Sequence, residues 1–324
     1  MANLINTVLG QIGPEELGRT LIHEHIVGGY PGWECDAFAR PYDKDRVAAI
    51  CVRVVGPVKD YGVNTIVDAT PIDLSRDVNV LKSVSEQLGI NVICSTGMYT
   101  EALGKWAYLK MRSRSKIGDM VAELYDTYMQ ELMKGIGNTG VKAGVIKVAT
   151  GVNKIADCEM ASLKAAARAQ KDTGVPIITH TEDGTMGPEQ LDILIAEGAD
   201  TQRIICGHMC CNSSIEYHLD VLKRGTYIGL DRFGVEVMMP DEVRKAMLMG
   251  LIGLGYSERI MISQDCFGCG FGRGGVLPEE EREKMKNWTF TNIFRNILPA
   301  IKAAGVTDEQ INKMMTGNPA RLFA

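Results

Sequence analysis

The sequence is poor in histidine, in aromatic residues and in positive charge. Of its 324 residues, five are His and three are Trp, and aromatic residues make up 6%. Lys and Arg number 35 against 40 Asp and Glu, which gives a formal net charge of −5 and argues against a surface for nucleic acid or anionic membranes. No apolar stretch reaches the ~18 residues of a transmembrane helix. We therefore expect a small-molecule partner, with no nucleic acid and no membrane.

The chain also lacks the features of an export signal. Its start, Met-Ala-Asn-Leu-Ile-Asn, has neither a positively charged segment nor a long apolar core. The nine Cys are an odd number, and without export they fit reduced thiols better than a disulfide framework. Both observations predict a cytoplasmic protein.

Apolar strand-like runs alternate with helical patterns along the whole chain. The length alone fits either two domains or one large barrel. Continuous apolar runs are typical of parallel strands buried on both faces, and no linker divides the chain. We predict a single domain, 1–324, with an α/β fold: a (β/α)8 TIM barrel preceded by a short β-hairpin. The eight expected strands are 19–26, 64–70, 90–97, 143–149, 175–180, 203–208, 226–231 and 259–265.

Four of the five histidines stand in or at the end of these runs. His23 and His25 are two residues apart, so in a strand both imidazoles point to the same side. His180 and His208 end the fifth and sixth runs. Because active sites of such barrels lie at the carboxyl ends of the strands, the four imidazoles are candidate metal ligands.

A lysine and an aspartate complete this set. Lys147 lies inside the apolar run Gly-Val-Ile-Lys-Val-Ala, where an ammonium is costly unless it is paired or chemically changed. Carboxylation by CO2 would turn Lys147 into an anion able to bridge two metal ions. Two imidazoles with Asp265 would then hold one ion and two imidazoles the other. Zn²⁺ is the first choice for these donors, with Co, Mn or Fe as alternatives, and such an ion pair activates a bridging water.

Six segments of the sequence resemble the phosphotriesterase family of the amidohydrolase superfamily, in the same order and over essentially the whole chain. The resemblance implies a binuclear metal centre and hydrolysis of esters. The metal positions that it implies are His23, His25, carboxylated Lys147, His180, His208 and Asp265. The segments are 18–26, 144–147, 177–181, 205–208, 229–234 and 262–265.

Two further matches indicate a branch of this family. Tyr99, in Thr-Gly-Met-Tyr, and Arg232, in Asp-Arg-Phe-Gly, resemble residues of the phosphotriesterase-like lactonases that face the substrate. The short segment between Phe233 and Pro240 is similar to that branch as well. The segment after His180, Thr-Glu-Asp-Gly-Thr, departs from the Ser-Asn-Ala-type turn of those lactonases, and the loop after residue 265 is rich in Cys and Gly.

This resemblance implies a lactonase that opens a neutral cyclic ester, with promiscuous phosphotriesterase activity as an accompanying possibility. A metal-bridging hydroxide would attack the lactone carbonyl, and one metal with Tyr99 would stabilise the oxyanion. Asp265 would pass the proton to the leaving alkoxide, and Arg232 would position the ring. An organophosphate triester, or another ester or amide, is the alternative substrate for the same centre. A non-catalytic metal-bound scaffold is a third alternative.

Other residues receive structural interpretations. Glu24 alternates away from its two histidine neighbours, so we expect a structural partner on the outer side of the barrel. Cys266 and Cys269 have CxxC spacing without a second pair, which does not favour a structural zinc or a redox role. His218 lies within a helical pattern and is expected to pack.

Aromatic residues gather after the first and third strands, in segments expected to be loops. Together they predict an exposed apolar patch and a homodimer. They are Tyr30, Trp33, Phe38, Trp106 and Tyr108.

Overall fold

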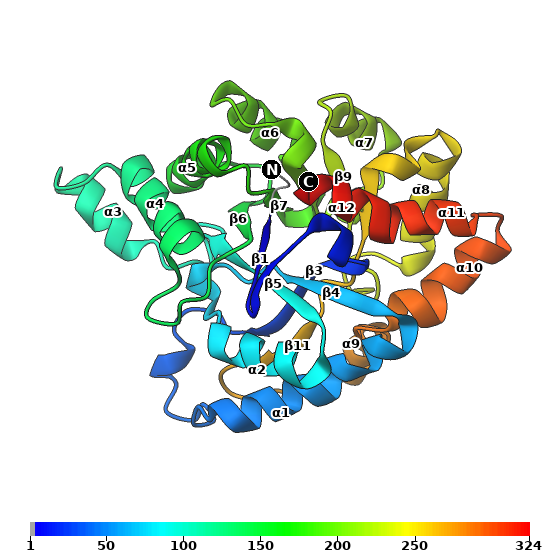
Figure 1. Ribbon diagram of the computed structural model, residues 1–324, viewed down its shortest axis with the longest axis horizontal. Coiled ribbons are helices and arrows are strands. Elements are labelled where there is room, and N and C mark those ends of the chain that lie inside the picture. Colours follow the sequence, from blue (N-terminus) through cyan, green and yellow to red (C-terminus); the bar gives the residue numbers. More distant parts are fainter. Residues whose placement is uncertain (1–3) are drawn as a thin grey trace.

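A computed structural model describes residues 4–324, so Met1–Asn3, which contributed to the expected location, lie outside the described residues. Nine parallel strands, eight barrel strands and the short β11 (Phe267–Gly270), curl into one sheet, which helices surround (Figure 1). The (β/α)8 barrel predicted from the sequence is confirmed. The eight barrel strands are β3 (Arg19–Gly28), β4 (Val63–Asp68), β5 (Asn91–Gly97), β6 (Val145–Thr150), β7 (Ile177–Thr181), β8 (Ile204–Gly207), β9 (Tyr227–Leu230) and β10 (Ile260–Ile262).

A small antiparallel hairpin, β1 (Ile5–Thr7) and β2 (Gly10–Ile12), precedes the barrel as expected. No helix within residues 4–324 is long and apolar enough to cross a membrane. The helices are α1 (Lys44–Val55), α2 (Val78–Leu88), α3 (Ala107–Arg114), α4 (Met120–Met129), α5 (Asp157–Thr173), α6 (Gly187–Ala196), α7 (Ile215–Leu222), α8 (Asp241–Gly253), α9 (Glu279–Lys284), α10 (Leu298–Ala303), α11 (Asp308–Asn312) and α12 (Asn318–Phe323).

The barrel interior is filled at the amino ends of the strands. Each of the eight strands contributes one apolar side chain to a single buried cluster, which Leu17, Leu322 and Phe323 extend. This layer is a packed core rather than a pore, as in other barrels of this kind. The polar residues are therefore displaced to the layer above, at the carboxyl ends. The eight strand residues are Ile22, Val67, Ile93, Val145, Ile178, Ile205, Tyr227 and Met261.

Strand β3 contains a bulge, and its residues contribute both to the apolar interior layer and to the polar layer above it. Leu21 pairs with Ile66 and Glu24 with Asp68, so β3 advances three residues where β4 advances two. Because of this extra residue, Ile22 joins the interior apolar cluster while its neighbour His23 also faces the interior. Bulges often redirect a side chain beside a functional site, and this one brings the first histidine into the barrel.

The barrel closes between β3 and the segment that follows β10. A short strand, β11 (Phe267–Gly270), pairs in parallel with β3, so the two edge strands of the sheet, β10 and β11, are joined by residues 263–266. In this joining segment Asp265 N–H donates to His23 O at 3.1 Å, and Cys266 O accepts from His25 N–H at 2.9 Å. The candidate ligand Asp265 therefore lies in the closing seam, directly beside the two strand histidines.

Glu24 fixes this seam from the outer side. Its fully buried carboxylate accepts hydrogen bonds from the Ser263 hydroxyl at 2.7 Å, from the Gln264 N–H and side-chain amide at 3.0 and 2.8 Å, and from the Cys266 N–H at 2.8 Å. All four partners are donors and lower the pKa of Glu24, but burial outweighs them and raises this pKa to about 8. The structural role expected for Glu24 is the one that it has.

Two expectations for the loops are wrong. The segment after β5 was expected to be a loop, but it contains α3, and Trp106 before this helix is buried with its indole N–H donating to Thr100 O. Trp106 therefore does not belong to an exposed aromatic patch. The segment after Asp265 is not a loop from its start but begins with strand β11. Phe267 and Cys269 pair there with the edge of β3.

We predict that Glu24→Gln lowers the free energy of unfolding by about 1 to 3 kcal/mol, because the new amide presents N–H groups to donors and leaves them unpaired. Urea denaturation measures the change. Glu86→Gln is the matched control, since Glu86 is exposed on α2. Equal stability of the two variants would contradict the assigned role of Glu24.

Candidate metal centre

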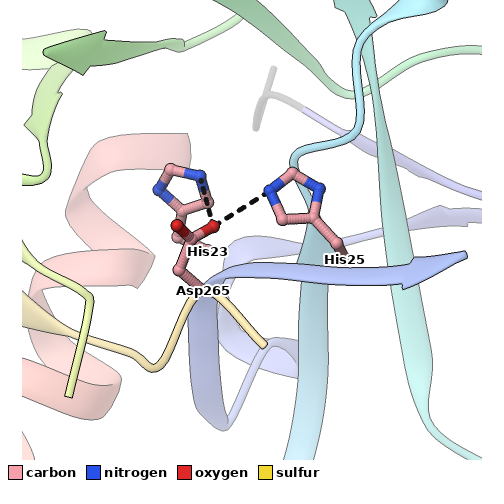
Figure 2. A group of neighbouring side chains, drawn as sticks. All are labelled: His23, His25 and Asp265. Carbon is pink, nitrogen blue, oxygen red and sulfur yellow. Dashed lines mark ion pairs between the residues drawn. The ribbon is translucent and has the colours of Figure 1, made fainter. Parts of the chain in front are cut away.

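The six predicted ligands converge at the carboxyl ends of the barrel strands. Figure 2 shows His23 and His25 on β3 with the Asp265 carboxylate between their rings. Asp265 Oδ1 lies 3.0 Å from His25 Nε2 and 3.7 Å from His23 Nε2. The three side chains form a group able to hold a metal ion. Lys147 Nζ lies 2.6 Å from His23 Nε2, so the strand-four lysine joins the same cluster.

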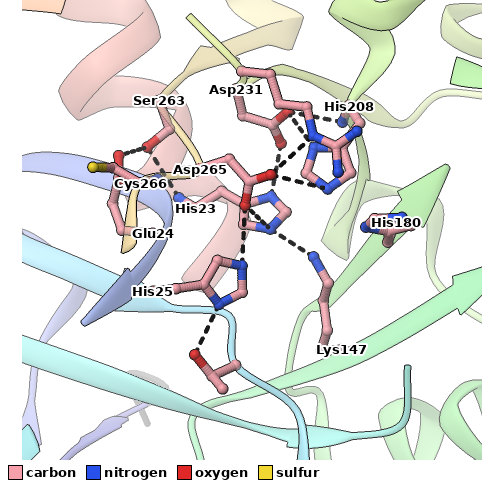
Figure 3. Close-up of polar contacts among 12 residues, drawn as sticks. His23, Glu24, His25, Lys147, His180, His208, Asp231, Ser263, Asp265 and Cys266 are labelled. Carbon is pink, nitrogen blue, oxygen red and sulfur yellow. Dashed lines mark hydrogen bonds and ion pairs between the residues drawn. The ribbon is translucent and has the colours of Figure 1, made fainter. Parts of the chain in front are cut away.

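The other two imidazoles continue this cluster across the barrel mouth (Figure 3). The His208 ring centroid lies 4.6 Å from that of His23, and the His180 centroid lies 4.4 Å from that of His208. All of these side chains are buried. The structure thus brings together every residue that the sequence placed in the centre.

Asp231, just after β9, orients two of the histidines. Its Oδ2 lies 2.7 Å from His23 Nδ1 and its Oδ1 lies 2.9 Å from His208 Nδ1. Asp231 Oδ1 also accepts the backbone N–H of His208, so the carboxylate is an acceptor in all three contacts. Each imidazole therefore donates from Nδ1 and keeps a lone pair on Nε2. His23, His208 and Asp231 also satisfy the geometry of a metal-holding group. Both Asp231 oxygens are occupied by imidazole N–H groups, so its role is to position the ligands.

Two glycines make room for Asp231. A Cβ on Gly229 would lie 2.6 Å from Asp231 Oδ2, and a Cβ on Gly207 would lie 2.3 Å from the backbone oxygen of Thr179. Contacts this short do not occur between real side chains, so both positions require glycine. The absence of these two side chains allows the carboxylate to lie beneath the imidazoles.

The electrostatics favour the neutral form of His23, His180 and His208, which is the form that binds a metal. Burial lowers the pKa of His180 to about 4 and, with the Arg232 charge, holds the pKa of His208 well below its ordinary value. Burial and the neighbouring Lys147 also lower the pKa of His23. Within residues 4–324, His208 Nε2 is a buried nitrogen with no hydrogen-bond partner. A lone pair in this position suits a metal ligand, so the donors fit a bound divalent cation.

Lys147 is, with Arg232, one of two buried basic side chains of the site. Burial lowers its pKa to about 8, although Asp265 and Asp231 oppose the shift. Its short contact with His23 Nε2 fits an ammonium donating to the imidazole lone pair. An amine with a lowered pKa is neutral in a larger fraction of molecules, and the neutral amine is the form that reacts with CO2.

His180 is oriented by Glu182, from the segment that departs from the lactonase pattern. His180 Nε2 lies 2.8 Å from Glu182 Oε2, so the ring donates from Nε2 and its Nδ1 is left free for a ligand. The His180 hydrogen bond lowers the pKa of Glu182, and its carboxylate is partly exposed at the mouth. Glu182 therefore contributes both to ligand orientation and to the negative charge facing a substrate.

Tyr99 and Arg232 both lie against the cluster. The Tyr99 ring is 4.9 Å from the His180 ring, and its backbone N–H donates to the buried Asp73. Arg232 Nε donates to Asp265 Oδ2 at 2.9 Å, so Arg232 pairs with the candidate ligand rather than with its neighbour Asp231. Burial raises the pKa of Asp265, but His208 and Arg232 outweigh it and hold the pKa well below its ordinary range.

The backbone is strained at two ligands. His208 has a φ of +58° and Asp265 a φ of +54°, in the left-handed region that non-glycine residues rarely adopt. Such conformations persist where surrounding contacts determine them, here the bonds to Asp231 and His23. Strain of this kind often occurs at functional sites, and it fits the candidate role of both residues.

Sequence reasoning missed three positioning groups: Asp231, Glu182 and Thr70, whose hydroxyl lies 2.8 Å from His25 Nδ1. Asp231 carried a usable signal, because it ends the seventh predicted strand. Glu182 stood in the departing turn after His180. Thr70 follows the second strand, but a hydroxyl there has no distinctive pattern.

Comparison with known proteins gives the same family that the sequence segments around the site resemble. The phosphotriesterase family model matches residues 3–323. This chain belongs to the phosphotriesterase family. The aryldialkylphosphatase of Saccharolobus solfataricus is 33% identical over 314 residues, which cover 97% of each chain. The organophosphorus hydrolase from Deinococcus radiodurans superposes with a TM-score of 0.96 at 40% identity, covering 100% of this chain and 97% of the other.

A further solved structure concerns organophosphate hydrolysis engineered from a weak promiscuous lactonase template. It matches with a TM-score of 0.95 and 39% identity, covering 99% of this chain and 100% of the other. The resemblance read from the sequence is thereby confirmed. The chain is a hydrolase of ester bonds, which leaves no support for the non-catalytic scaffold.

We predict that Asp231→Asn weakens metal affinity by roughly 10- to 100-fold, because one imidazole N–H then faces an amide N–H instead of a carboxylate oxygen. Competition with a chromogenic chelator measures the affinity. Asp192→Asn is the control, since Asp192 pairs with Arg224 at the surface. Unchanged affinity in Asp231→Asn would contradict the positioning role.

Proposed function

We propose that this phosphotriesterase-family hydrolase opens a lactone ring at the mouth of the barrel, with hydrolysis of phosphotriesters as a side activity. The observation that carries the proposal is the placement of Tyr99 and Arg232, the two lactonase-like residues, directly against the metal-ligand cluster. The solved lactonase template, similar over 99% of this chain, supports the same substrate class. The carboxylates of Glu182 and Asp265 favour an uncharged substrate over an anionic one.

The centre is assigned to two divalent ions, with Zn²⁺ as the first choice and Co, Mn or Fe as alternatives. His23, His25 and Asp265 would hold one ion, His180 and His208 the other, and Lys147 carboxylated by CO2 would lie between them. When bound, the two ions supply an activated water and polarise the ester carbonyl. The residues around them determine where the substrate lies and where the protons go.

Tyr99 and Arg232 are assigned to substrate positioning and Asp265 to proton transfer. The Tyr99 hydroxyl donates to the oxyanion that develops on the lactone carbonyl. Arg232, held by Asp265, orients the ring or its substituent. Asp265 accepts the proton of the attacking water and passes it to the leaving alkoxide, so that water is added across the ester bond.

The alternative function keeps the centre and changes the substrate to an organophosphate triester, or to another carboxylic ester or amide. The aryldialkylphosphatase and the organophosphorus hydrolase among the similar proteins favour it. Residues 1–324 would act as a single catalytic domain under either function. A cytoplasmic location and the absence of nucleic-acid and membrane partners stay predictions.

A substrate panel with an Asp265→Ala control tests the function. We expect wild-type protein loaded with Zn²⁺ or Mn²⁺ to contain about two ions per chain, and to hydrolyse aliphatic γ- and δ-lactones faster than an aryl ester or a triester. Asp265→Ala should lower kcat/KM by roughly 100-fold or more, since proton transfer and a ligand are both lost.

The panel also defines the contrary results. Inertness on every lactone together with cleavage of the triester would select the alternative function. Fewer than one ion per chain in metal-supplemented protein, or undiminished hydrolysis in Asp265→Ala, would overturn the assigned centre.

We also propose a homodimer. Tyr30, Phe38 and Tyr108 are 53%, 76% and 64% exposed, so three of the five aromatic residues expected in the patch reach the surface. Light scattering at micromolar concentration should give twice the mass of one chain, and Phe38→Ser combined with Tyr108→Ser should shift it toward the monomer. A monomer mass for the wild type would contradict the proposal.

A further inference from the structure

Two cysteines far apart in the sequence meet behind the metal centre. Cys51 lies on the buried face of α1, and Cys269 lies on β11 opposite Val27 of β3. Helix α1 packs against β11, and each of the two thiols shifts the pKa of the other. The Cys51 thiol also donates to Ile26 O at 3.2 Å. Cys266, the other member of the CxxC spacing, instead approaches Trp288 O at 3.7 Å. The CxxC spacing is therefore not the functional unit, and Cys51 and Cys269 form the pair.

A cavity gives solutes access to one thiol of this pair. A small cavity of about 50 Å³ adjoins Cys269, which is partly exposed, whereas Cys51 is fully buried. A small solute in the cavity can therefore reach the Cys269 sulfur but not the buried Cys51 sulfur. Arg40 and Arg46 line the same cavity and add positive charge to it.

The surroundings also favour the thiolate of Cys269. The Cys51 thiol and the charges of Arg40 and Arg46 lower the pKa of Cys269 to about 7, although burial opposes the shift. The contact with Cys269 and burial raise the pKa of Cys51. At pH 7 the nucleophilic thiolate is therefore about half of the accessible Cys269 sulfur, and the buried sulfur stays protonated.

We propose that Cys269 is a peroxide-reactive thiol and that Cys51 resolves its oxidised form as a disulfide. The Cys269 thiolate attacks one oxygen of a small hydroperoxide: the S–O bond forms, the O–O bond breaks, and the alkoxide leaves as an alcohol after taking a proton. Cys51 then attacks the sulfenic sulfur, forming the S–S bond while the hydroxide leaves as water with the Cys51 proton. Two thiols lose two electrons, and the peroxide gains them.

The disulfide would connect the redox pair to the metal centre. β11 pairs with β3 at Phe267 and His25, and the Phe267 ring stacks on the His25 imidazole with centroids 4.6 Å apart. A bond from α1 to β11 would constrain the strand that carries this ring. Oxidation is therefore expected to alter the environment of one candidate metal ligand, independently of the substrate that the enzyme uses.

The test is a peptide map of wild-type protein treated with stoichiometric hydrogen peroxide and then alkylated under denaturing conditions. We expect a peptide pair linked through Cys51 and Cys269, and two fewer alkylated thiols among the nine cysteines. Cys51→Ser should stop at a sulfenic acid on Cys269 that dimedone traps, and Cys269→Ser should form no link. Cys35→Ser, which removes an exposed cysteine, is the control and should retain the link.

A second readout needs no variant. Iodoacetamide should modify Cys269 of the native wild type roughly five- to tenfold faster than Cys35 at neutral pH, and the Cys269 rate should rise with half-maximum near pH 7 as the thiolate forms. Oxidation of Cys35 without a Cys51–Cys269 link, or a Cys269 rate no greater than that of Cys35, would overturn the proposal.

Discussion

The buried Glu24 carboxylate is the constraint on which the metal centre depends. It stands between two histidines that face the barrel interior, and on the other side of β3 it accepts four hydrogen bonds from the segment that joins β10 to β11. The same segment carries Asp265 in a strained conformation. One acidic side chain therefore closes the barrel and fixes the distance between ligands contributed by its first and last strands.

Two further carboxylates, those of Asp231 and Glu182, orient the imidazoles of the site. Asp231 accepts from two imidazoles, and these contacts fix the side on which each ring keeps its lone pair. Glu182 does the same for His180. Burial keeps the rings neutral, so the barrel presents imidazole lone pairs beside a lysine whose ammonium is itself disfavoured by burial. Neutral imidazoles and carboxylates of this kind would be stabilised by bound metal cations.

The identity of the substrate is less determined than the chemistry of the centre. Tyr99 is held by Asp73 and Arg232 by Asp265, so both have fixed positions beside the ligands. Glu182 adds a partly exposed carboxylate at the mouth of the barrel. The family assignment therefore establishes ester hydrolysis, while the choice of ester depends on how these three side chains share the mouth of the barrel.

The sequence by itself determined the barrel and predicted the six candidate ligands, because continuous apolar runs follow from the burial of parallel strands. His23, Lys147 and Asp265 are polar residues within or at the ends of such runs. Tertiary structure decided the rest. The bulge in β3, the pairing of β11 with β3 and the meeting of Cys51 with Cys269 depend on which strands lie side by side when the sheet closes. No local pattern encodes these pairings, since the bulge depends on residues about 45 positions apart and the closure on residues more than 200 positions apart.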